Sequence, residues 1–186
     1  YTRSSDLSIT TGFAGAGAFS DGKLSLSPDV GGNLPEILGY DRTIELLKES
    51  DDIYLKFGAD EKVYGIDEAE EIASIRKKAI QANLKLIECP IRHLGTEEGY
   101  KIYSRLQEHL LNEGVDMIFD TMVKDIIIED GVAKGVVTDK GETYTADEIV
   151  AAVGREGSEW LSGICRKYDI ETQVGTVDVG VRVEVR

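Results

Sequence analysis

Three short segments joined by glycine-containing turns constrain the fold of this chain more than any other feature of its sequence. Val123–Ile128, Val132–Thr138 and Thr143–Thr145 are rich in β-branched residues, which favour strands. Asp130-Gly131 and Lys140-Gly141 separate them, and glycine supplies the positive φ that tight hairpin turns require. The sequence therefore predicts an antiparallel β-meander.

Helical patterns lie on both sides of this meander. Apolar residues recur at three- and four-residue spacing over 40–57, 68–83, 96–112 and 156–167, as they do along one face of an amphipathic helix. Glutamates gather in the first turns of the second and third segments, where negative charge offsets the helix dipole. We expect four helices over these ranges, with Thr96 as the N-cap of the third.

Further strands are expected outside the meander. Ile149–Val153 is a continuous apolar run, of the kind that forms a parallel strand covered on both faces. Alternating valines over 177–185 predict a half-buried strand. Shorter strands are expected at Leu7–Thr10, Leu84–Ile91 and Val115–Phe119. Helices combined with a meander and a parallel-type strand predict an α/β fold.

The glycine-rich stretch GFAGAGAFSDGKL, residues 12–24, nearly matches two phosphate-binding patterns. A dinucleotide fingerprint needs a third glycine where Ser20 stands, and a helix after the loop. A P-loop needs a serine or threonine as Mg²⁺ ligand where Leu24 stands. Because neither pattern fits, two interpretations stay open: a loop that contacts a planar, oxygen-rich ligand, and a purely structural loop. Phe13 and the alanines between the glycines favour the first, since small residues let a flat ligand approach the backbone.

Charge and composition exclude several classes of function. The net charge is −14 and the basic residues are scattered, so nucleic acids and anionic membranes are poor partners. No apolar run approaches the roughly 20 residues that span a membrane, and no signal peptide is visible. Cys89 and Cys165 lie far apart without a C-x-x-C motif, which favours two buried thiols in the reducing cytoplasm over a disulfide.

Other polar groups are interpreted as parts of the solvated surface. The glutamates at 68, 70 and 71 have no histidine partner and favour dipole compensation over a metal site. Asp51-Asp52 and His109 are expected on exposed helix faces. The chain begins without methionine and ends inside the alternating valines, so we expect a fragment of a longer protein.

Several segments, in order along the chain, resemble a known class of proteins. These segments are Ile9–Leu24, Gly31–Leu34, Arg92–Thr96, Thr121–Ile126, Ala146–Arg155 and Asp178–Glu184. The ordered set is similar to a group of uncharacterised bacterial FAD-dependent dehydrogenases of the glutathione-reductase-type flavoprotein class. The resemblance implies a partial, Rossmann-like FAD-binding domain with the meander, a helical excursion and the beginning of a substrate domain. It divides the chain into a flavin-edge loop (1–39), a helical excursion on the substrate side (40–92), the second half of the FAD domain (93–168) and the first strand of a substrate domain (169–186).

The resemblance also implies roles for individual residues. The glycine-rich loop would lie along the ribityl chain and the flavin ring. Its cofactor-binding positions would be Gly15, Gly17, Ser20, Asp21, Gly22 and Lys23.

Four further positions, Val123, Val153, Gly154 and Arg155, would face other parts of the cofactor. Val123 matches a position whose backbone faces the adenine, and Ala152-Val153-Gly154 resembles a strand end that passes close to the FAD pyrophosphate. Val153 stands where that motif has threonine, which removes a hydroxyl contact. Arg155 would pair with a phosphate or with a substrate acid. His93 is a candidate proton donor, and its alternative role is that of a hydrogen-bonded loop histidine.

One part of the class pattern does not occur in the sequence. The G-x-G-x-x-G unit and the acidic residue that hold the ADP half of FAD would precede Tyr1. We therefore expect a fragment of an FAD-dependent oxidoreductase that transfers hydride through the flavin and, by itself, binds FAD weakly or not at all. The sequence does not specify the substrate, the electron donor or the oligomeric state. Two alternatives are a P-loop-like phosphotransferase and a non-catalytic, acidic interaction module without a small ligand.

Overall fold

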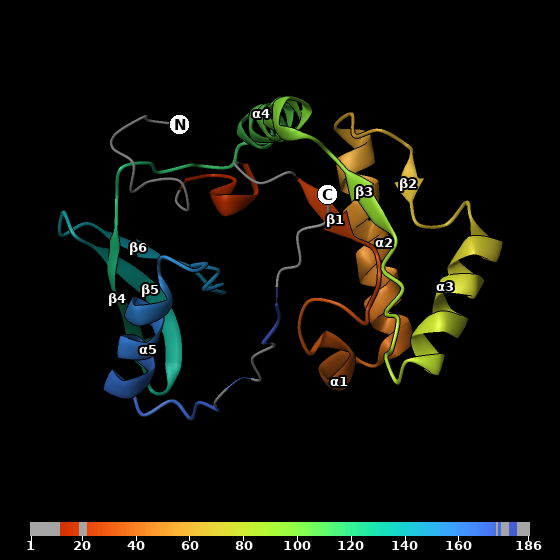
Figure 1. The fold of residues 1–186 in the computed structure, drawn as a ribbon. Coiled ribbons are helices and arrows are strands. Elements are labelled where there is room, and N and C mark those ends of the chain that lie inside the picture. Colours follow the sequence, from red (N-terminus) through yellow and green to blue (C-terminus); the bar gives the residue numbers. More distant parts are fainter. Residues whose placement is uncertain (1–11, 19–21, 174, 176–178, 182–186) are drawn as a thin grey trace. The chain divides into compact units, whose positions relative to one another are not determined.

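The computed structural model describes residues 12–18, 22–173, 175 and 179–181 of the chain. The chain divides into two compact units, with the boundary between Phe119 and Asp120, and each unit is described by itself (Figure 1). The strand predicted at Leu7–Thr10 lies outside the described residues, as does most of the strand predicted over 177–185.

The first unit combines helices with a small antiparallel sheet. The strand order is β1-β3-β2, and β3 pairs with β1 and β2 on its two edges. The elements are η1 (Gly15–Ala18), β1 (Lys23–Ser25), α1 (Leu34–Leu38), α2 (Tyr40–Lys56), β2 (Val63–Tyr64), α3 (Ala69–Gln81), β3 (Ile91–His93) and α4 (Thr96–Asn112).

The three long helices of this unit confirm the helices predicted from apolar periodicity. α2, α3 and α4 begin and end within two residues of the predicted bounds. The predicted N-cap was wrong by one position: Thr96 is the first helical residue, and the cap is Gly95 with φ +72°. Glycine tolerates this left-handed conformation, which threonine adopts only with strain.

The core of the first unit is centred on the start of α4. Ile102 is only 1% exposed, and Leu94, which precedes the helix, is also buried. Thr43 of α2 is buried as well, and its hydroxyl donates a hydrogen bond to the carbonyl oxygen of Gly39 (2.8 Å). The segment from β3 to α4 is therefore the most firmly packed part of the unit.

The second unit confirms the predicted antiparallel meander. It contains β4 (Val123–Glu129), β5 (Val132–Thr138), β6 (Thr143–Thr145) and α5 (Ser158–Lys167), with strand order β4-β5-β6. Asp130 and Gly131 join β4 to β5 and both have positive φ, as the tightest hairpin turn requires.

Helix α5 is attached to the first strand of the meander. Trp160 donates a hydrogen bond from Nε1 to the carbonyl oxygen of Lys124 (3.1 Å). Tyr168, which ends the helix, donates from its hydroxyl to the carbonyl oxygen of Ile126 (2.7 Å). Lys167 pairs with Asp125. These three contacts hold α5 along β4.

The strands predicted outside the meander are largely wrong for the described residues. Val115–Phe119 and Ile149–Val153 have no strand structure, and Val150 is 87% exposed. The predicted strand Leu84–Ile91 is reduced to the pairing that begins at Ile91. A parallel strand needs a parallel neighbour and cover on both faces, whereas both sheets within the described ranges are antiparallel.

Candidate functional site

The glycine-rich loop makes one short 3₁₀ turn and then leads to a strand. Gly12 and Gly15 have φ of +94° and +51°, a region that other residues adopt only with strain. The amide of Gly15 donates to the carbonyl oxygen of Gly12 (3.1 Å). The next described element is β1, so no helix N-terminus follows the loop as a P-loop or a dinucleotide fingerprint requires. This arrangement contradicts the phosphotransferase alternative.

Two glycines of the described loop pack closely against the segment from β3 to α4, and at Gly22 only glycine fits without strain. A Cβ on Gly17 would lie 3.0 Å from the hydroxyl oxygen of Tyr103 on α4. Gly22 is buried at φ +63°, and a Cβ there would lie 2.8 Å from Cβ of Leu94. The carbonyl oxygen of Gly22 also accepts a hydrogen bond from the amide of Leu94 (2.8 Å). The loop is therefore fastened to the buried segment between β3 and α4.

The strand pairing brings together two residues predicted for the site. Lys23 of β1 is the cross-strand partner of His93 of β3, and both are exposed. The hydrogen bonds from Leu94 to Gly22 and from Leu26 to Pro90 make this a non-hydrogen-bonded pair, in which facing side chains start closest together. A cationic group and an imidazole thus share one exposed surface at the end of the glycine-rich loop.

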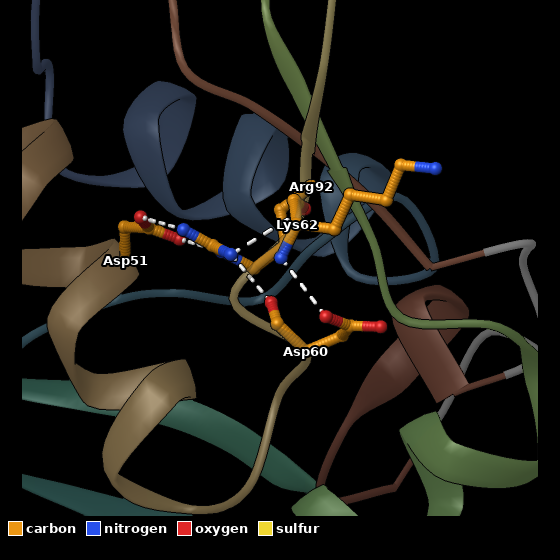
Figure 2. A network of polar contacts seen from close by, with 4 residues as sticks. All are labelled: Asp51, Asp60, Lys62 and Arg92. Atoms are coloured by element: carbon orange, nitrogen blue, oxygen red, sulfur yellow. Dashed lines mark hydrogen bonds and ion pairs between the residues drawn. The ribbon is translucent and has the colours of Figure 1, made fainter.

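The opposite face of β3 is held by a buried ion pair that sequence reasoning missed. Arg92 donates from Nε and Nη2 to the two carboxylate oxygens of Asp51 on α2, at 2.5 and 2.7 Å. Its Nη1 reaches the carbonyl oxygens of Asp60 and Lys62, as Figure 2 shows. The side chains of Arg92 and Asp51 are 4% and 13% exposed. The hydrogen bond to Asp51 raises the pKa of Arg92 above its ordinary value.

This network corrects one prediction and explains how His93 is held. Asp52 is exposed as predicted, but Asp51 is not a surface residue. Because successive side chains of a strand point to opposite faces, anchoring Arg92 against α2 directs His93 to the other face. The network therefore fixes the strand that carries the candidate proton donor.

Helix α4 links the loop to the end of α2 through aromatic contacts. The rings of Tyr103 and Tyr54 meet edge to face with centroids 6.0 Å apart, and their hydroxyl oxygens lie 3.5 Å apart. One turn and a half further on, His109 lies against Phe57, with ring centroids 5.3 Å apart. The prediction that His109 lies on a solvated face was wrong, because its ring covers Phe57 and is half-buried.

Four predicted cofactor positions belong to the second unit. Val123 begins β4 opposite Thr138 and is half-buried. Val153, Gly154 and Arg155 form the turn before α5, where Gly154 has φ +62°. The amide of Gly157 donates to the carbonyl oxygen of Val153 (3.3 Å). The structure thus gathers Gly15, Gly17, Gly22, Lys23 and His93 in the first unit and Val123, Val153, Gly154 and Arg155 in the second, while Ser20 and Asp21 lie outside the described residues.

The residues present fit one part of an FAD molecule and not another. No atom of the described residues lies within 4 Å of the place where a Cβ of Gly12 would point, which leaves room beside the loop backbone for a flat ligand. Lys23, the first residue of β1, carries a positive charge and is exposed. The glycine-rich loop offers no helix N-terminus to the ADP half, because the next described element is β1.

The described part of the chain does not point to a metal site, a disulfide or a membrane-spanning helix. No group of three metal-ligating side chains is found there. Cys89 and Cys165 are both free thiols, half-buried, and they belong to different units. Among the described helices, none combines the length and the apolar character that crossing a membrane requires.

Comparison with known proteins identifies the family. No curated protein matches the sequence. Residues 63–185 match the family model described as pyridine nucleotide-disulphide oxidoreductase. This match covers more than half of the chain and includes β3 with His93, α4, the meander and the turn before α5, whereas the glycine-rich loop precedes it. The chain belongs to the pyridine nucleotide-disulphide oxidoreductase family.

Proposed function

We propose that this chain is part of an FAD-dependent oxidoreductase that exchanges electrons with a pyridine nucleotide. Family membership over residues 63–185 carries the proposal, and the family description names the pyridine nucleotide. The loop supports it, since its glycines leave the backbone open on one side and fasten it to α4 on the other. The resemblance to bacterial dehydrogenases stays a prediction. So does the division of the chain into the four segments 1–39, 40–92, 93–168 and 169–186.

The proposed roles follow from where the residues lie. Bound FAD would supply hydride transfer between the nucleotide and a second substrate. The backbone of the loop, at Gly12 and Gly15, would lie against the flavin. Lys23 would neutralise negative charge on the cofactor or the substrate. His93, held on β3 by the Arg92 network, would give a proton to a substrate atom or take one from it.

Cys89 and Cys165 do not form a dithiol redox motif, so the proposed chemistry of this chain does not use them. Cys89 and Cys165 belong to different units and carry free thiols. A dithiol redox motif places its two cysteines together in one turn. The disulphide in the family description therefore has no counterpart in the two cysteines of this chain.

Exposed apolar segments support the proposal that further chain completes the fold. Ile118 and Phe119 are each nearly half exposed, and Val150 almost fully. These segments have the composition of buried strands, and isolated proteins rarely leave such runs uncovered. We propose that strands outside this sequence, including a G-x-G-x-x-G unit, cover them and hold the ADP half of FAD.

Anaerobic reduction tests this function. The chain extended to its natural start would be purified and mixed with NADH or NADPH while flavin absorbance is followed. Bleaching of the flavin bands by either nucleotide is the expected result. A protein that carries flavin but is bleached by neither nucleotide would contradict the pyridine nucleotide as electron donor. A protein that carries no flavin would contradict the proposal as a whole.

An interaction module without a small ligand is the second candidate. Apolar side chains on α1 and α2 favour it, because Ile37 is 76% exposed and Tyr40 and Ile44 are about half exposed. The same extended protein distinguishes the two functions. A colourless protein that elutes with a stoichiometric partner would favour the module, and a yellow protein would favour the oxidoreductase.

A further inference from the structure

We propose that Tyr103 is a positioning residue for the flavin-binding loop, acting through Gly17. The inference rests on the proposed function and adds to it a residue that belongs to neither the loop nor the predicted set. Its basis is a contact between α4 and the 3₁₀ turn. The hydroxyl of Tyr103 occupies the place into which any side chain on residue 17 would point.

A side chain on residue 17 would meet the hydroxyl of Tyr103 before it met the ring. A Cβ on Gly17 would be 3.0 Å from the hydroxyl oxygen of Tyr103 and 3.8 Å from its ring carbon Cζ. The first distance is tighter than an ordinary contact and the second is an ordinary one. Gly17 has no left-handed φ, so its backbone would accept alanine. An alanine at residue 17 would therefore require the hydroxyl of Tyr103 or the 3₁₀ turn to shift by a few tenths of an ångström.

A second tyrosine limits where that oxygen can move. Tyr54 of α2 packs edge to face on the Tyr103 ring, and its own hydroxyl oxygen is 3.5 Å from that of Tyr103. A shift of Tyr103 away from Gly17 would disturb this pair. Tyr103 therefore contacts both Tyr54 of α2 and the backbone of the loop at Gly17.

A four-variant comparison tests the inference in the chain extended to its natural start. Wild type, Gly17→Ala, Tyr103→Phe and the double variant would each be titrated with FAD, and the visible spectrum of the bound flavin recorded. Gly17→Ala should weaken FAD binding about tenfold and shift the flavin bands, because coupling of contacting residues reaches this size. In the double variant the added methyl group meets Cζ at an ordinary distance, so affinity and spectrum should return to those of Tyr103→Phe.

The controls separate positioning from simple support of the fold. Thermal unfolding of each apoprotein would be measured beside the titrations, and Tyr40→Phe, at an exposed tyrosine of the same unit, should change neither quantity. If Gly17→Ala and Tyr103→Phe act additively on FAD affinity, the inference is overturned. It is also overturned if their coupling occurs only in the melting temperature. If the wild type takes up no FAD, the proposed function fails and this inference fails with it.

Discussion

Removing the carboxylate of Asp51 should destabilise the first unit far more than the loss of an exposed helix carboxylate would. Asp51→Ala leaves the guanidinium of Arg92 buried without its bidentate partner. Breaking a buried pair from one side costs about 3–5 kcal/mol. Arg92 keeps two backbone carbonyls, those of Asp60 and Lys62, and we therefore expect the lower end, about 3 kcal/mol. That is about a hundredfold in the unfolding equilibrium constant.

Urea titration followed with two probes measures the loss of stability in the first unit separately from the second. Far-UV circular dichroism follows mainly the helices, most of which belong to the first unit. Trp160 is the sole tryptophan, and its fluorescence follows the second unit. Asp52→Ala, one residue further along the same helix and exposed, is the matched control and should change stability by at most about 0.5 kcal/mol.

Two results bear on the reasoning. A double variant, Asp51→Leu with Arg92→Met, removes both charges and should recover much of the loss, because apolar replacement of a buried pair is often neutral. Equal, small decreases of the circular-dichroism midpoint in Asp51→Ala and Asp52→Ala would refute a stabilising role for the buried pair. That outcome would mean that Arg92 finds water or another acceptor when Asp51 is gone.

Three further predictions concern the loop, the second unit and the chemistry. Gly22→Ala should lower the free energy of unfolding by about 2 kcal/mol or more, because φ is +63° and Leu94 blocks the new methyl group. Gly163→Ala, with no described atom near its new methyl group on α5, should raise it by about 0.5–1 kcal/mol. Equal effects of the two variants in urea titrations would contradict the close packing at Gly22. The hydrogen bond from Lys167 lowers the pKa of Asp125 below its ordinary value of 3.8. The stability that the Lys167–Asp125 pair gives the second unit is therefore present above pH 3.8 and is lost as the pH falls through the lowered pKa of the folded state. Followed by tryptophan fluorescence, the stability of the second unit should fall more steeply with acid in wild type than in Asp125→Asn, and parallel curves would argue against the pair. His93→Asn in an active extended protein should lower turnover about a hundredfold with unchanged FAD affinity, and unchanged turnover would leave His93 as a loop histidine.

Local patterns predicted the elements that depend on local chemistry. Helices α2, α3, α4 and α5 follow from apolar periodicity, and the meander follows from β-branched runs with glycine turns. Each of these patterns is contained in a short stretch of sequence, so it can be recognised without knowledge of distant contacts. Helix α1 was missed because it is only five residues long and lies in a glycine-rich region. Pro35 in its first turn was the available signal.

Contacts between distant residues could not be predicted from spacing. Asp51 and Arg92 are 41 positions apart, and nothing in the Asp51-Asp52 pair says which carboxylate turns inward. The pairing of Lys23 with His93 depends on the register of two three-residue strands. The helical pattern over 96–112 includes Tyr103, but it does not indicate which residue the tyrosine hydroxyl contacts.

The predicted strand at Ile149–Val153 was wrong for a different reason. Its composition suits a strand buried among parallel neighbours, but neighbours are not a property of the segment itself. The described sheets supply antiparallel edges only, so the run stays irregular and Val150 is exposed. The pattern of a segment can therefore show that it suits a parallel strand, but not whether the described chain supplies the neighbouring strands.

The visible absorption spectrum of two purified proteins tests the central claim most directly. One is this chain of 186 residues, and the other is the same chain extended to its natural start. The account predicts that the extended protein is yellow with flavin bands and that the shorter one is colourless or holds FAD weakly. If neither protein takes up added FAD, the flavoprotein account is contradicted, and the interaction module becomes the better description.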